Sequence, residues 1–201
     1  MARVESQEWD RRYAGAELVW TGEPNRFVVD ELRDLAPGRA LDAGAGEGRN
    51  AVWLAARGWQ VTAVDFSAVG LDKGRRLAGA RGVTVDWVRA DLRDYQPEPG
   101  SFQLVLVAYL QLRAAELDGV LRRAVTALAP GGVLLAVGHD VTNLAEGVGG
   151  PPDPEVLYTP ESITRSLSGL TVLRAERVRR PVSGVSGDRE AVDTLVRAAR
   201  D

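Results

Sequence analysis

The stretch Leu41-Asp42-Ala43-Gly44-Ala45-Gly46-Glu47-Gly48-Arg49-Asn50 follows a short apolar segment and precedes a helical pattern. Its three glycines alternate with other residues, so the backbone can bend sharply and a ligand can approach the main chain closely. The spacing is G-x-G-x-G, whereas the dinucleotide-binding fingerprint G-x-G-x-x-G needs glycine at position 49, where this chain has arginine. Two interpretations follow: a nucleoside cofactor without a pyrophosphate, or NAD.

Short apolar segments alternate with longer helical patterns around this stretch. This rhythm predicts an α/β fold with a Rossmann-like, doubly wound and mostly parallel sheet. The run 102–108 is almost entirely apolar, as expected for a central strand covered on both faces. Glycines weaken the helix expected over 67–80. The expected strands are 39–43, 61–65, 83–88, 102–108 and 133–137, and the expected helices are 48–57, 67–80 and 114–128.

The chain departs from this rhythm after residue 140. Residues 141–160 are rich in glycine and proline and are expected to form a loop, which could close over a substrate or serve no function. A short helix is expected over 160–168, with Thr159 as N-cap and Pro160 at its first position. Residues 170–179 and 190–198 are predicted to form a hairpin that turns at 183–187.

The composition limits the function. At 201 residues, 45% of them hydrophobic, the chain is expected to form a single domain with a substantial core. It has no cysteine and one histidine, which excludes disulfides, thiolate nucleophiles and multi-histidine zinc sites, and no tight acidic cluster indicates another metal. The net charge of −3 favours a small-molecule substrate over nucleic acid. A local arginine cluster is expected to form a solvated strand face: Arg174, Arg177, Arg179 and Arg180.

The sequence contains no run of 18 uncharged apolar residues, and it begins with a polar segment. We therefore expect a cytoplasmic protein with neither a membrane span nor a signal peptide. The sequence is compatible with a monomer or a homodimer.

Polar side chains gather at the expected carboxyl ends of the strands, where ligands of open α/β sheets bind. The Asp65 carboxylate could accept hydrogen bonds from both hydroxyls of a ribose, or it could cap the helix that follows Phe66. Asp91 could accept from an adenine amine while the Leu92 N–H donates to the ring, or it could be an ordinary loop aspartate. Asp42 could pair with an ammonium group or orient the glycine loop.

These groups suit S-adenosylmethionine. Its ribose needs an acidic partner, its amino acid tail needs close backbone and carboxylate contacts, and its sulfonium favours aromatic or carbonyl surroundings. NAD would instead place its pyrophosphate on the glycine turn and the helix N-terminus, where Glu47 would repel it.

The stretch 41–51, with its Gly-Glu-Gly-Arg-Asn form, resembles class I S-adenosylmethionine-dependent methyltransferases. It is similar to the small bacterial group that includes tellurite-resistance-type and thiopurine-type methyltransferases. The resemblance covers roughly residues 8–140, and residues 9–13 and 20–25 resemble the N-terminal segment that covers the cofactor in that group. Many relatives carry cysteine where this chain has Ala45, but only the loop backbone touches the cofactor in that family.

The resemblance implies a seven-stranded sheet whose last strand is antiparallel, in agreement with the expected hairpin. It also implies S-adenosylmethionine as cofactor, with ribose and adenine at the second and third strand ends. The residues expected to bind it are Tyr13, Trp20, Asp42, Gly44, Ala45, Gly46, Gly48, Asn50, Asp65, Phe66, Asp91, Leu92 and Ala108.

Methyl transfer from a sulfonium is an in-line displacement, so the protein mainly aligns the reactants and excludes water. A base is needed only where the acceptor must lose a proton. His139 is the candidate base because it is the sole histidine and ends the fifth strand, although it could merely bond the backbone. Asp140 could orient it, but neighbouring strand residues point in opposite directions. Tyr109 could line the acceptor pocket, with His139 and Asp140, or only pack.

The N-terminal aromatic side chains could form a lid, although for Trp9 we favour packing of the N-terminal helix against the sheet. The expected organisation is a helical cap (1–35), a cofactor-binding core (36–140), the loop (141–160), and a helix with a hairpin (161–201). The expected function is methyl transfer to a small-molecule acceptor. Two other classes stay open: a non-catalytic S-adenosylmethionine-binding protein and, less favoured because of Arg49, an NAD-linked oxidoreductase.

Overall fold

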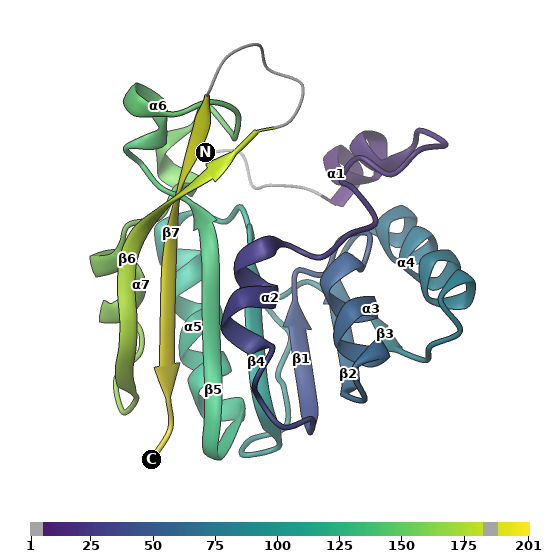
Figure 1. Cartoon of the computed structure of the whole chain (residues 1–201), viewed down its shortest axis with the longest axis horizontal. Helices are drawn as coiled ribbons and strands as arrows, with labels where there is room; N and C mark the ends of the chain where they lie inside the picture. Colours follow the sequence, from purple (N-terminus) through teal and green to yellow (C-terminus); the bar gives the residue numbers. More distant parts are fainter. Residues whose placement is uncertain (1–5, 183–188) are drawn as a thin grey trace.

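Seven strands form one sheet in the computed structural model, which describes residues 6–182 and 189–201. The order is β3-β2-β1-β4-β5-β7-β6; β1 to β5 pair in parallel, and β7 pairs antiparallel with both β5 and β6 (Figure 1). This confirms the doubly wound, mostly parallel sheet with an antiparallel last strand. The strands are β1 (Arg39–Ala43), β2 (Gln60–Asp65), β3 (Asp86–Arg89), β4 (Phe102–Ala108), β5 (Leu128–His139), β6 (Thr171–Pro181) and β7 (Glu190–Ala199).

Helices cover both faces of this sheet. One apolar core lies between the sheet and the helices α2 and α3, and the other lies between the sheet and α5 and α7. Successive residues of β4 enter opposite cores, which confirms a central strand covered on both faces. The helices are α1 (Ser6–Tyr13), α2 (Arg26–Leu32), α3 (Arg49–Ala56), α4 (Ala68–Ala80), α5 (Ala114–Ala127), α6 (Asn143–Glu146), the 3-10 turn η1 (Pro154–Val156) and α7 (Pro160–Arg165).

Two glycines allow α3 and α4 to pack closely against β3. Gly48, with φ +78, caps α3, and Gly74 lies inside α4. A Cβ at either position would overlap the Trp87 ring of β3. Gly74 therefore lowers the helix propensity of α4 but makes room for a buried contact between α3, α4 and the sheet.

Two strand boundaries differ from the expected ones. β3 begins at Asp86 because the N–H of Val83 donates to Ala78 O at the end of α4, so the start of the apolar run belongs to the helix exit. β5 begins at Leu128, before the Pro-Gly-Gly segment, because Leu128 pairs with Phe102, the first residue of β4. The start of β5 depends on a partner 26 positions away that a local pattern does not reveal, whereas the helix exit before β3 is local and is marked by Gly82, with φ +64.

The region 141–160 is mainly a loop, as expected, but it also contains α6, η1 and a parallel bridge between Asp140 and Tyr158. The N-cap Thr159 and the first-turn Pro160 of α7 are confirmed. The hairpin of β6 and β7 is confirmed, whereas its expected turn at 183–187 lies outside the described residues. None of the helices in the described ranges is long and apolar enough to cross a membrane.

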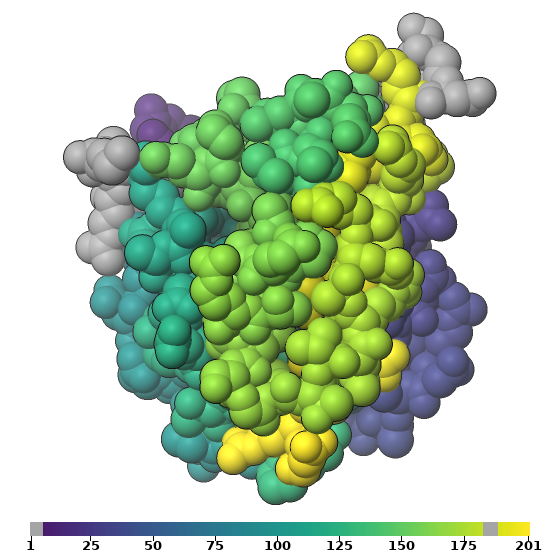
Figure 2. Space-filling view, turned by 90° about the vertical axis from the view of Figure 1, so that its left-hand side faces the viewer, coloured from purple at the N-terminus to yellow at the C-terminus, as the bar shows by residue number. Residues whose placement is uncertain are grey.

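β6 forms one edge of the sheet, and it lies beside α7 on the side of the molecule seen in Figure 2. Three of its four clustered arginines are 42–52% exposed, in line with a solvated face. Arg180 differs: it is only 23% exposed and pairs with the buried Asp193. The expectation of a solvated face is therefore wrong for Arg180.

Candidate functional site

A pocket lies at the carboxyl ends of the parallel strands, where ligands of open α/β sheets bind. The carboxyl ends of β1, β4 and β5 and the helix α1 lie toward the same end of the molecule (Figure 1). The pocket lining comes from α1 and from the residues that follow β1, β2, β3 and β4: Trp9, Tyr13, Gly44, Asp65, Phe66, Asp91, Leu92, Tyr109, Leu110, Gln111 and Leu112.

Asp65 connects the pocket to the glycine loop. It is 7% exposed, and its two oxygens accept from the N–H groups of Gly46 and Ser67, each at 2.8 Å. Burial raises the pKa of Asp65 to about 6, although these two N–H groups oppose the rise. Since a carboxylate has about four acceptor positions, about two remain for ligand hydroxyls. The N-cap of α4 is Ser67, so Asp65 does not cap that helix itself.

The glycine loop depends on left-handed backbone. Gly44 has φ +87 and Gly46 has φ +55, conformations that side chains other than glycine rarely adopt. A Cβ on Gly44 would lie 3.0 Å from the Leu110 side chain, and one on Gly46 would lie 2.8 Å from the Tyr13 hydroxyl. The loop is thus bare main chain with Tyr13 and Leu110 close against it.

Asp42 is buried below the loop without a partner. It is 1% exposed, and neither carboxylate oxygen has a hydrogen-bond partner within residues 6–182 and 189–201. Burial, with the nearby charge of Asp65, raises the pKa of Asp42 to about 7. A buried carboxylate of this kind favours a nearby cation or its own protonation.

Asp91 and Leu92 follow β3. Arg93 donates hydrogen bonds to the Asp91 carboxylate from Nε at 2.9 Å and from Nη2 at 2.5 Å. The Leu92 carbonyl accepts from Arg123 Nη2 at 2.7 Å. These bonds fix the backbone of the segment that lines the pocket.

The N-terminal segment is tied to the glycine loop through Glu47. This carboxylate is 3% exposed, accepts from the N–H groups of Val19 and Trp20 at 3.1 Å, and pairs with Lys73 at 3.0 Å. Asp10 of α1 accepts from Ser67 at 2.5 Å, at the start of α4. Glu47 therefore holds the N-terminal segment in place. Because Lys73 compensates its charge and Glu47 is not among the pocket-lining residues, the expected repulsion of a pyrophosphate by Glu47 is a weaker argument against NAD.

A second polar cluster adjoins the pocket at Tyr109, whose φ of +55 is unusual for a residue other than glycine. The Tyr109 hydroxyl donates to Asp193 Oδ2 at 2.7 Å and accepts from Asn25 Nδ2 at 3.2 Å. Its ring contacts the His139 ring edge-on, with centroids 4.9 Å apart. Burial and the Asp193 charge raise the pKa of Tyr109, so it stays protonated and donates.

Asp193 is the centre of this cluster. It is fully buried, His139 Nδ1 lies 3.1 Å from its Oδ1, and Arg180 Nε lies 2.9 Å from its Oδ2. Burial alone would raise the pKa of Asp193, but the contacts with His139, Arg180 and Tyr109 hold it below its ordinary value. Asp193 could not be predicted as a site residue because it lies in a hairpin 54 positions after His139; an acidic residue in the middle of a strand was the available signal.

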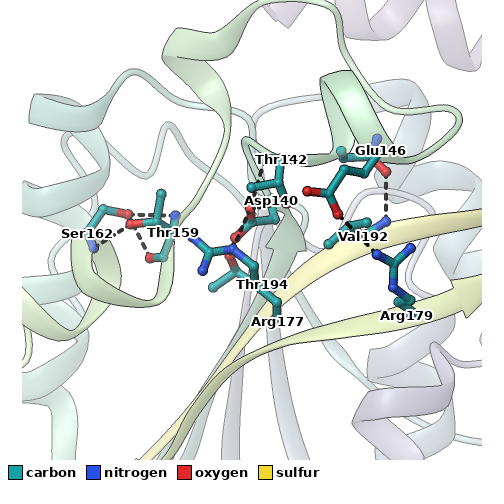
Figure 3. Close-up of polar contacts among 10 residues, drawn as sticks. Asp140, Thr142, Glu146, Thr159, Ser162, Arg177, Arg179, Val192 and Thr194 are labelled. Atoms are coloured by element: carbon teal, nitrogen blue, oxygen red, sulfur yellow. Dashed lines mark hydrogen bonds and ion pairs between the residues drawn. The ribbon is translucent and has the colours of Figure 1, made fainter.

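The structure does not bring Asp140 to the pocket or to His139 as its partner. Its carboxylate, fully buried, accepts from Thr142 N at 2.9 Å, Thr194 Oγ1 at 2.5 Å and Arg177 Nε at 3.0 Å (Figure 3). The alternation of side chains along β5 sends Asp140 and His139 to different partners. Asp140 therefore ties the end of β5 to β6 and β7.

Six of the expected cofactor residues line the pocket: Tyr13, Gly44, Asp65, Phe66, Asp91 and Leu92. The others lie outside that lining: Trp20, Asp42, Ala45, Gly46, Gly48, Asn50 and Ala108. Asn50 binds the N-terminal segment instead, since its Oδ1 accepts from Asn25 N at 2.9 Å. Trp9 lines the pocket and lies 5.5 Å from the Tyr13 ring, so it does more than pack the helix; its spacing of four residues from Tyr13 was the signal. No group of three or more metal-ligating side chains occurs in the described ranges.

Residues 40–132 match the family model described as "Methyltransferase domain". The strand order and the antiparallel β7 give the chain the Rossmann-like methyltransferase fold. Sequence and fold thus agree on the class of protein to which this stretch is similar.

Individual relatives agree with this class. The chain is 34% identical over 125 residues to the demethylmenaquinone methyltransferase of Thermus thermophilus, an alignment that covers 61% of this chain and 55% of that protein. A solved structure described as "Conversion of a Disulfide Bond into a Thioacetal Group during Echinomycin Biosynthesis" superposes with a TM-score of 0.77 at 24% identity, covering 98% of this chain and 92% of the other. TehB from Haemophilus influenzae superposes with a TM-score of 0.73 at 14% identity, covering 98% and 67%. The alignment spans about half the length of this curated relative.

Proposed function

We propose that this protein is an S-adenosylmethionine-dependent methyltransferase that acts on a small-molecule acceptor. The observation that carries the proposal is the pocket in which the glycine loop, Asp65 and the segment Asp91–Leu92 meet at neighbouring strand ends. The match of residues 40–132 to the methyltransferase domain supports it.

The residues present fit the cofactor. Asp65 keeps acceptor positions for the two ribose hydroxyls. The Leu92 N–H suits an adenine ring nitrogen, while the Asp91 carboxylate lines the pocket beside it and is paired with Arg93. Gly44 lines the pocket without a side chain, which allows an amino acid tail to approach its main chain. The carboxylate of Asp42 lies buried near the loop without a hydrogen bond in the described residues and outside the pocket lining, and an ammonium group bound at the loop would favour its ionised form.

The chain's own contribution to the reaction is alignment and exclusion of water. S-adenosylmethionine, when bound, supplies an activated methyl group on a sulfonium. Trp9 and Tyr13 place aromatic rings in the pocket wall, which suits a sulfonium. The hydrogen bonds of Glu47 and Asp10 hold this N-terminal cap over the pocket. His139 is not among the lining residues but contacts one of them, Tyr109, and it is the candidate base for the acceptor.

A small acceptor agrees with the same features. Trp9 and Tyr13 of the N-terminal cap form part of the pocket wall, and the net charge is −3. The N-terminal segment also resembles that of the tellurite-resistance-type and thiopurine-type group. In this proposal residues 36–140 bind the cofactor, 1–35 cap it, 141–160 cover the acceptor side, and 161–201 complete the sheet.

Calorimetry with S-adenosylmethionine, S-adenosylhomocysteine and NAD tests the cofactor. We expect micromolar or tighter binding of the two sulfur compounds and none of NAD; the reverse pattern would refute the proposal in favour of an oxidoreductase. Transfer of a labelled methyl group to a panel of hydroxyl, thiol, amine and chalcogen-oxyanion acceptors then tests catalysis. Binding without transfer to any of them would support a non-catalytic binding protein.

A further inference from the structure

We propose that Asp193 is a positioning residue that holds His139 in the tautomer protonated at Nδ1, which leaves Nε2 as the proton acceptor. The catalytic part of this inference rests on the proposed methyl transfer. The tautomer itself can be measured without any acceptor.

The geometry allows one bond between the two side chains. His139 and Asp193 are directly paired in register between β5 and β7, and His139 Nδ1 lies 3.1 Å from Asp193 Oδ1. The two atoms lie within ion-pair distance but out of hydrogen-bond alignment, and neither has any hydrogen-bond partner in the described ranges, so each is the nearest group that can satisfy the other. The other carboxylate oxygen, Oδ2, is already taken by the Tyr109 hydroxyl at 2.7 Å and by Arg180 Nε at 2.9 Å.

These contacts determine where the imidazole proton lies. A neutral imidazole has one N–H donor and one bare nitrogen, and an ionised carboxylate can only accept. Arg180 keeps a positive charge beside the fully buried Asp193, so the carboxylate is held ionised. The nitrogen that faces it must therefore carry the proton, and the lone pair is left on Nε2.

The ring is also held from both sides. Tyr109, which lines the pocket, contacts it edge-on. Gly150, with φ +80, lies against it so closely that an added Cβ would be 3.0 Å from His139 Cγ. Gly150 of the loop thus packs against the ring, which is 13% exposed, and this leaves the imidazole little freedom to turn.

This arrangement suits an acceptor whose reacting atom carries a proton. The acceptor atom forms a bond to the methyl carbon while the carbon–sulfur bond breaks and its electron pair returns to sulfur. The acceptor proton moves to Nε2 of His139, and the resulting imidazolium is stabilised by Asp193. The sulfonium charge is consumed as the imidazolium charge appears, so the step is balanced.

The experiment uses the single histidine of the chain. Protein labelled with ¹⁵N-histidine gives one imidazole in a long-range ¹H–¹⁵N spectrum, which distinguishes the two tautomers at a pH where the ring is neutral. We expect the Nδ1–H tautomer in the wild type.

Asp193→Asn should reverse the tautomer. The single amide oxygen of Asn faces two donors, Tyr109 and Arg180, so its NH₂ group turns toward Nδ1 and forces the proton to Nε2. The matched control is Asp140→Asn, which alters another fully buried, arginine-paired carboxylate at the same end of the sheet and should leave the tautomer unchanged.

A wild-type spectrum dominated by Nε2–H would overturn the inference even if Asp193→Asn fails to fold. The same conclusion follows if folded Asp193→Asn keeps Nδ1–H, or if Asp140→Asn changes the tautomer equally. Binding of S-adenosylhomocysteine within about twofold of wild type verifies that the variants are folded. Absence of such binding in the wild type would refute the proposed function while leaving the tautomer result intact.

Discussion

The two halves of the pocket end of the sheet are built differently: the cofactor half lies at β1, β2 and β3, and the acceptor half lies at β4, β5 and β7. At the ends of β1, β2 and β3, the main contacts join residues close in sequence, such as Gly46 and Asp65, which are 19 positions apart. At the ends of β4, β5 and β7, they join distant residues, such as Tyr109 and Asp193, 84 positions apart. The cofactor half is therefore a local β-α-β unit, whereas the acceptor half depends on the C-terminal hairpin.

The buried carboxylates of the two halves also differ in charge compensation. In the cofactor half, burial raises the pKa values of Asp42 and Asp65. In the acceptor half, the pKa values of Asp140 and Asp193 lie below the ordinary value despite burial, because hydroxyl, imidazole and guanidinium groups bind them. The cofactor half keeps acceptors that a ligand can use, and the acceptor half is satisfied by arginines of β6.

The largest effect is expected from Gly48→Ala in the cofactor half. Gly48 and Gly100 both have left-handed backbone, with φ of +78 and +64, but only Gly48 faces the Trp87 ring. We expect Gly100→Ala to lower the free energy of unfolding by about 1 kcal/mol and Gly48→Ala by about 4 kcal/mol, measured by urea unfolding. Equal losses would contradict the role assigned to the Trp87 contact.

Asp65→Ala should weaken binding of S-adenosylhomocysteine by about 100-fold or more, since it removes charge-assisted bonds to two hydroxyls as well as the support of Gly46. Calorimetry measures this. Asp72→Ala, an exposed aspartate of α4, is the control and should stay within twofold. Because only ionised Asp65 accepts fully and its pKa is about 6, wild-type affinity should rise between pH 5 and pH 7. An unchanged affinity in Asp65→Ala would disprove the ribose assignment.

Without ligand, the free energy of unfolding of Asp42→Asn relative to wild type should increase as the pH rises. The folded-state pKa of Asp42 is raised from 3.8 to about 7, so the wild type loses stability between these values, where only the unfolded chain releases the proton. We expect the stability of the variant relative to wild type to be about 2 kcal/mol higher at pH 8 than at pH 5, as a difference in thermal or urea unfolding. A difference independent of pH would show that Asp42 is already ionised in the folded protein.

The smallest effect is expected on the acceptor side. Arg177 is 43% exposed, and Asp140 keeps its bonds to Thr142 and Thr194 without it, so Arg177→Ala should cost less than about 1 kcal/mol. Arg180→Ala should cost about 2 kcal/mol because it leaves the fully buried Asp193 without its guanidinium. Urea unfolding of both variants tests this order, and a larger loss for Arg177→Ala would reverse the ranking of the two ion pairs.

Much of the fold could be read from the chain because its signals are local. Alternating apolar strands and amphipathic helices, Pro160 after Thr159, and the break after residue 140 each arise within a few residues. The start of β5 could not be read this way, since its partner Phe102 lies 26 positions earlier in the chain.

The sequence by itself determined the α/β class, the glycine loop and the acidic strand ends, because backbone freedom and the position of a residue at a strand end are properties of short segments. Only the tertiary structure decided which carboxylate meets His139. Pairing of β7 with β5 sets Asp193 opposite the imidazole, while the alternation of side chains directs Asp140 to Arg177 and Thr194. Such a choice depends on strand register, which no segment of β5 or β7 contains alone.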